Sequence, residues 1–115
     1  MSRDNAVLLD IQEACQRIVE FTAGLEREEF LHDRLRQSAV LHQLLVLGEA
    51  DKRIFEDTRS AAPQIPWGDI AGMRDKLIHA YHSVDIELVW EVTRTHVTQL
   101  LRDLTPLMPQ PGEES

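Results

Sequence analysis

The fold is decided by residues 40–48, which read VLHQLLVLG. Apart from His42 and Gln43, these residues are apolar, which is too broad an apolar surface for a helix that buries only one face. Gly48 closes the run, and a glycine weakens a helix while letting another backbone come close. We therefore expect a long helix, from near Asp33 to near Asp57, that is covered on two sides and forms an interface between two subunits.

Amphipathic periodicity predicts three further helices around this one. The first covers about residues 4–24 and is linked to the second by the acidic residues 26–29. The third opens at Pro66, since a proline in the first turn loses no hydrogen bond that a helix needs, and ends near residues 81–83. The fourth begins at Asp85, a good N-cap residue, and gives way to a proline-rich end.

No segment shows the alternation of a strand. The sequence therefore predicts an all-α fold, an antiparallel up-and-down four-helix bundle that dimerises through its second and third helices. We assign the bundle domain to residues 1–105 and a flexible acidic tail to residues 106–115.

Composition narrows the class of function. The chain has 115 residues and a formal net charge of −8, with twelve basic against twenty acidic side chains. Proteins that coat nucleic acid, DNA included, need clustered Lys and Arg, so this class is excluded, whereas a local pocket for one phosphate is not. The sequence has no apolar run of the roughly 18 residues that a membrane span needs, and its first residues lead us to expect no secretory leader. With Cys15 as a buried, inert thiol, we expect a cytoplasmic protein without a cofactor.

The chemistry concentrates in residues 72–82, GMRDKLIHAYH. On one helix Arg74 lies at the edge of the core face and should be partly buried, so its guanidinium needs an acceptor, for which Glu49 is our candidate. His79 lies about 140° around the helix from Arg74. Asp75, one turn before His79, is placed to orient the imidazole. Either the helix ends near His79, or Arg74 and His79 meet across two subunits, and we favour the second arrangement.

The pattern Arg74-x4-His79-x-Tyr81 resembles the motif of the HepT-like toxins, within the HEPN superfamily of helical ribonucleases. Residues 47–53 are similar to the family's second-helix block, and residues 63–67 and 70–75 to its turn and third-helix block. Residues 84–85, followed by 89–90, are similar to the start of its last helix, and the order is the same. His82 departs from the family, which often has an aromatic residue there.

The resemblance implies a homodimer with a composite cleft and metal-independent cleavage of RNA, such as tRNA or mRNA. It implies catalytic roles for Arg74 and His79 and supporting or RNA-contacting roles for Asp75, Tyr81 and Glu49. It also implies a toxin that is neutralised by a nucleotidyltransferase antitoxin, which attaches AMP to Tyr81.

Several alternatives stay open. Arg74 could only satisfy Glu49, His79 could be a solvated histidine, and Tyr81 could be a packing residue. His79 and His82 with Asp85 could bind a metal, although no established zinc pattern accompanies them. The main rival function is a non-catalytic helical dimer that serves as the partner and substrate of a nucleotidyltransferase.

Overall fold

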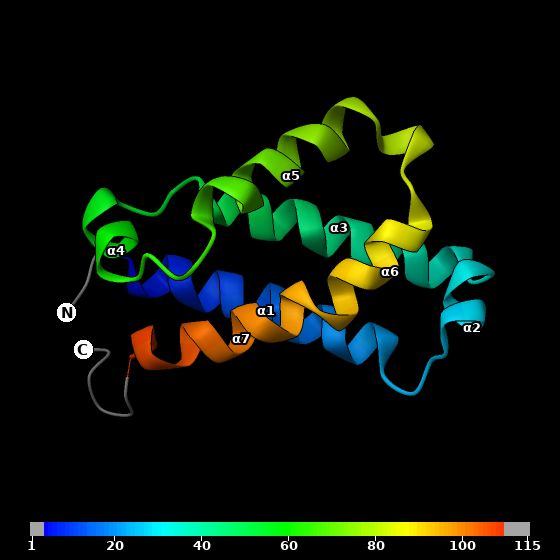
Figure 1. Cartoon of the computed structure of the whole chain (residues 1–115), viewed down its shortest axis with the longest axis horizontal. Helices are drawn as coiled ribbons and strands as arrows, with labels where there is room; N and C mark the ends of the chain where they lie inside the picture. Colours follow the sequence, from blue (N-terminus) through cyan, green and yellow to red (C-terminus); the bar gives the residue numbers. More distant parts are fainter. Residues whose placement is uncertain (1–3, 110–115) are drawn as a thin grey trace.

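The computed structural model describes residues 4–109, and its regular elements are all helical (Figure 1). Among these residues there is no strand, so the predicted all-α class is confirmed. The elements are α1 (Asn5–Thr22), α2 (Arg27–Leu31), α3 (Arg34–Asp51), α4 (Glu56–Ala61), α5 (Trp67–His79), η1 (Tyr81–Ser83), α6 (Ile86–Arg94), α7 (His96–Leu104) and η2 (Thr105–Leu107).

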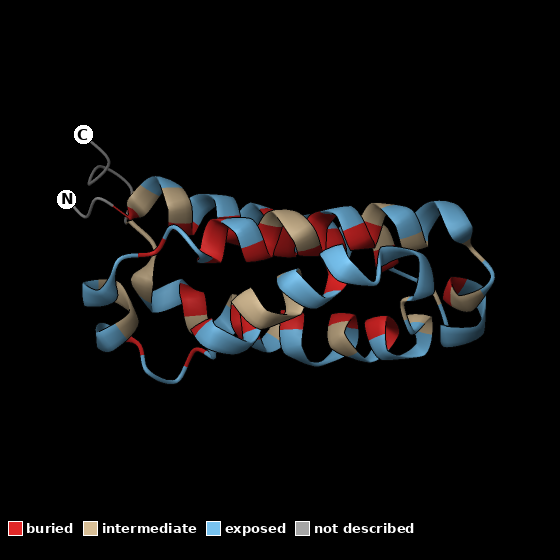
Figure 2. Ribbon diagram, turned by 90° about the horizontal axis from the view of Figure 1, so that it is seen from above, coloured by how far each residue is buried: buried red, intermediate tan, exposed pale blue. Residues whose placement is uncertain are grey.

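Four helical rods run along the long axis of the molecule: α1, α3, α5, and α6 with α7 as one broken rod (Figure 1). The chain reverses direction from each rod to the next, as an up-and-down bundle requires. Buried residues line the inner faces of these rods, and exposed residues cover the outside (Figure 2). Cys15 lies in this core, where burial raises the pKa of its thiol to about 12, so it is inert as expected.

The predicted second helix is shorter than expected, because α3 ends at Asp51 rather than near Asp57. The break lets Ile54 enter the core, where its side chain is 5% exposed. A new helix, α4, then starts after Phe55, whose backbone N–H donates to the Asp4 carboxylate. The break between the two helices thus coincides with burial of Ile54 and with a hydrogen bond from Phe55 to a distant carboxylate.

Two other connections differ from the sequence prediction. The acidic link at residues 26–29 opens a short helix, α2, because Glu26 and Glu29 form a reciprocal capping box. The predicted fourth helix breaks at Thr95, whose φ of −116° and ψ of −64° end α6. Asp85 caps α6 as predicted, since its side chain accepts hydrogen bonds from the backbone N–H groups of Glu87 and Leu88.

At the end of the bundle domain, Leu107 and Met108 still pack against the core, so the packed chain extends past residue 105. The rest of the predicted tail, residues 110–115, lies outside the described residues. Within residues 4–109 no helix combines the length and the apolar character that crossing a membrane demands.

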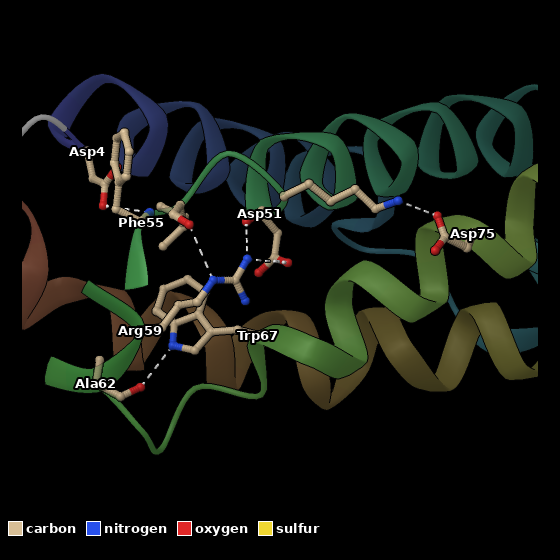
Figure 3. Close-up of polar contacts among 9 residues, drawn as sticks. Asp4, Asp51, Phe55, Arg59, Ala62, Trp67 and Asp75 are labelled. Carbon is tan, nitrogen blue, oxygen red and sulfur yellow. Dashed lines mark hydrogen bonds and ion pairs between the residues drawn. The ribbon is translucent and has the colours of Figure 1, made fainter. Parts of the chain in front are cut away.

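A buried acidic side chain fixes the junction of α3 with α4. Asp51 is fully buried, and its carboxylate lies 3.8 Å from the Arg59 guanidinium (Figure 3). Arg59 also donates to the backbone oxygens of Asp51 and Ile54, which ties α4 to the end of α3. Burial raises the pKa of Asp51 to about 6, although the nearby positive charges of Arg59 and Lys52 lower it.

Candidate active site

The site begins with a close contact between two helices. A Cβ atom at position 48 would overlap the Cβ of Arg74 and lie 2.8 Å from its Cγ. Helices α3 and α5 can therefore approach this closely only because residue 48 is glycine. We attributed Gly48 to an interface between subunits, and this was wrong for the glycine itself, since the backbone that it admits belongs to the same chain.

The Arg74 side chain lies along this contact and is 26% exposed. Its Nη2 is 2.7 Å from Glu49 Oε2, so the predicted pairing with Glu49 is confirmed. Its Nη1 donates to Asp75 Oδ1 at 3.2 Å. The guanidinium is thus oriented by one carboxylate from α3 and another from α5.

Asp75 connects Arg74 to a residue that sequence reasoning missed. Its Oδ1 accepts a hydrogen bond from Lys52 Nζ at 2.6 Å, from the C-terminal end of α3 (Figure 3). The hydrogen bonds from Lys52 and then from Arg74 hold the pKa of the Asp75 carboxyl below its usual range. The expected pairing of Asp75 with His79 is not formed, because no hydrogen bond or ion pair joins the two within residues 4–109. Asp75 turns toward the basic side chains instead.

His79 is the last residue of α5 and is exposed. The helix is continuous from Trp67 to His79, so His79 and Arg74 leave it in directions about 140° apart. A shallow pocket of about 450 Å³ illustrates the separation. It is lined by Arg74 but not by His79, and its lining residues are His42, Leu45, Val46, Glu49, Arg53, Arg74 and Ile78.

Tyr81 follows α5 in the 3-10 turn η1 and is 37% exposed. The rings of Tyr81 and His82 form a T-shaped pair, with ring centroids 5.9 Å apart and ring planes at 90° to each other. The hydroxyl of Tyr81 has no hydrogen-bond partner in the part of the chain that the structure covers. Tyr81 is therefore a rim residue and not a core residue.

The side chains that could bind a metal do not form a cluster in the described part of the chain. Across residues 4–109, no three His, Cys, Asp or Glu side chains come together as a set of ligands. The candidate trio of His79, His82 and Asp85 is thus not assembled there.

Comparisons with known proteins identify the family of this chain. The family model described as "Ribonuclease HepT-like" matches residues 11–107. A Thermococcus cleftensis protein named "Probable ribonuclease HepT" is 44% identical over 93 residues, 81% of this chain and 84% of that protein. The Methanocaldococcus jannaschii protein "Putative RNase MJ1216" is 40% identical over 90% of this chain and 85% of its own.

A third relative comes from a different organism. "Putative RNase TTE0752" from Caldanaerobacter subterraneus is 31% identical over 94% of this chain and 96% of its own. No solved structure is significantly similar to this chain. The match covers α3 and α5, the two helices that build the site around Arg74. The chain therefore belongs to the HepT-like ribonuclease family, a family of HEPN-type RNases.

Proposed function

We propose that this protein is the toxin of a toxin–antitoxin pair and cleaves RNA without a metal ion, with Arg74 and His79 as its catalytic residues. One observation carries the proposal: the Arg74 side chain packs against Gly48 of α3, is held by Glu49 at 2.7 Å, and stays 26% exposed. A fixed guanidinium with free donors suits a phosphate, whose oxygens it can bind while staying charged.

The reaction needs three things from the protein. A base removes the proton of a 2′-hydroxyl, whose oxygen attacks the adjacent phosphorus. Arg74 stabilises the negative charge that gathers on the phosphoryl oxygens. An acid gives a proton to the 5′-oxygen as the P–O bond to it breaks. The products are a 2′,3′-cyclic phosphate and a 5′-hydroxyl, and His79 serves as the proton-transfer group because imidazole titrates near neutrality.

The active form in this proposal is a homodimer. Within one chain Arg74 and His79 leave α5 in different directions, so a cleft shared by two copies is the simpler way to unite them. Apolar side chains support pairing through α3 and α5. Ile78 is 47% exposed, and it lines the Arg74 pocket together with the partly buried Leu45 and Val46. Pairing of two such faces would remove these side chains from water.

The resemblance extends the proposal to control of the toxin in the cytoplasm. A nucleotidyltransferase antitoxin would transfer AMP to the Tyr81 hydroxyl, with release of pyrophosphate from ATP. The exposure of Tyr81 in η1 and its free hydroxyl support this assignment. An AMP group at the rim of the site adds bulk and negative charge, both of which oppose RNA binding.

The chemistry of the product ends tests the proposal. The purified, unmodified protein is incubated with tRNA and with total RNA in excess chelator. We expect fragments with 2′,3′-cyclic phosphates and 5′-hydroxyls, and no fragments from an Arg74→Ala variant. Fragments with 5′-phosphates would contradict attack by the 2′-hydroxyl. Absence of cleavage of every RNA would favour the rival, a non-catalytic dimer that a nucleotidyltransferase modifies.

A further inference from the structure

We propose that Lys52 is a second phosphate-binding cation of the RNA site, beside Arg74, an inference that rests on the ribonuclease function proposed above. Both cations converge on one atom. Asp75 Oδ1 is 2.6 Å from Lys52 Nζ and 3.2 Å from Arg74 Nη1. An oxyanion is thus already bound by the ammonium of Lys52, directly after α3, and by a guanidinium from α5.

The Asp75 oxygen occupies the position that a phosphoryl oxygen would take. Carboxylate and phosphate oxygens accept the same charge-assisted hydrogen bonds from Lys and Arg. The contacts are accessible, since the side chains of Lys52 and Asp75 are 36% and 51% exposed. An exposed ion pair is weak enough for an incoming anion to exchange with it.

The arrangement around Arg74 allows this exchange without loss of order. Arg74 binds Glu49 through Nη2 and Asp75 through Nη1, two separate nitrogens. A phosphate can therefore replace Asp75 at Nη1 while Glu49 continues to fix the guanidinium on α3. Asp75 then acts as a placeholder that holds Lys52 and Arg74 at one point before RNA arrives.

The other lysine of the chain provides a matched control. Lys52 and Lys76 are the two lysines in the sequence. Lys76 lies on α5, close in sequence to Arg74, but it lines a different groove between α5 and α6, together with Asp69 and Asp85. Replacement of either lysine by alanine changes the net charge equally, whereas only Lys52 meets the atom that Arg74 binds.

The test measures RNA binding as a function of salt. A fluorescently labelled tRNA is titrated with the full chain carrying His79→Ala, which prevents cleavage, and with Lys52→Ala or Lys76→Ala added. Loss of one phosphate contact weakens binding about tenfold at low salt and lowers the slope of log Kd against log salt by roughly 0.7 to 0.9. We expect both effects for Lys52→Ala, neither for Lys76→Ala, and retention of the slope in Lys52→Arg.

Each other result overturns the inference. Equal behaviour of the two alanine variants would show that Lys52 contributes only net charge. Weaker binding with an unchanged slope, or with a lowered unfolding temperature, would show a structural role. Absence of salt-dependent binding by the parent chain would remove the phosphate site altogether. Failure of the proposed function is seen separately, as intact RNA after incubation with the unmodified wild-type chain.

Discussion

Gly48 on α3 lies directly against Arg74 on α5, so closely that no side chain fits at position 48. This contact fixes the distance between the two helices that carry the site. It also fixes the position of the Arg74 Cβ and Cγ atoms, while the guanidinium of the same side chain binds Glu49 and Asp75. One small residue therefore couples helix packing to the position of the proposed catalytic guanidinium.

Replacement of that glycine tests the coupling. In Gly48→Ala the new methyl group overlaps Arg74, so we expect a loss of about 1 to 3 kcal/mol in the free energy of unfolding in urea, and a loss of RNA cleavage. Gly72→Ala on α5 is the control, since a Cβ atom there meets nothing within 4 Å. That variant gains helix propensity and should be at least as stable as the wild type. Equal destabilisation by both substitutions would refute the account.

The Glu49 carboxylate should matter for turnover more than for stability. Glu49 is about half exposed, so removing its charge costs under about 1 kcal/mol of stability. In Glu49→Gln the guanidinium of Arg74 loses its strongest orienting contact, and we expect kcat for RNA cleavage to fall about tenfold. Glu13→Gln, which removes the carboxylate of an exposed pair with Arg17 on α1, should leave kcat unchanged. A wild-type kcat in Glu49→Gln would show that this pairing is only structural.

The proposed dimer depends on the apolar side chains near Arg74. In Ile78→Glu a charge enters that surface, and we expect a dimer to become a monomer in light scattering. Leu9→Glu is the comparison, because Leu9 on α1 is similarly exposed, 43% against 47% for Ile78. Dimers that persist in Ile78→Glu would contradict a dimer interface at Ile78. Dissociation in Leu9→Glu as well would show that the effect is not specific to this surface.

Asp51 should make stability depend on pH between about 4 and 6. Its pKa is raised to about 6 by burial, so the folded chain binds this proton more tightly than the unfolded chain does. Ionisation of Asp51 therefore lowers the free energy of unfolding as the pH rises through this range. Asp51→Asn removes this penalty. At about 1.4 kcal/mol for each pKa unit, we expect the variant to exceed the wild type in stability by up to about 3 kcal/mol at pH 7, but not below about pH 4. Thermal unfolding of both proteins at several pH values measures the difference, and a constant difference would contradict it.

The long rods and the Arg74–Glu49 pair could be predicted because both follow from local rules. Helical periodicity gives the rods, and a half-buried guanidinium on α5 must find an acceptor on the neighbouring helix. The breaks after Asp51 and at Thr95 could not be predicted in this way. The first depends on Ile54 reaching the core and on Asp4, about fifty residues away, binding Phe55.

The environment of Asp75 shows where spacing alone fails. The four-residue spacing of Asp75 and His79 allows the two side chains to pair on one helix, and this spacing predicted that pair. The rotation of α5 against α3 turns Asp75 toward Lys52 instead. Which carboxylate meets which cation depends on how α3 and α5 pack, and only the packed structure reveals this.

In the proposed mechanism, His79 and Arg74 cleave RNA without a metal ion. The most direct measurement is cleavage of tRNA in excess chelator by the unmodified wild type, His79→Ala and His96→Ala, the last with an exposed histidine on α7. The account predicts equal cleavage by wild type and His96→Ala, and a loss of at least about 100-fold in His79→Ala. Cleavage that stops in chelator, or that proceeds at the wild-type rate in His79→Ala, would contradict it.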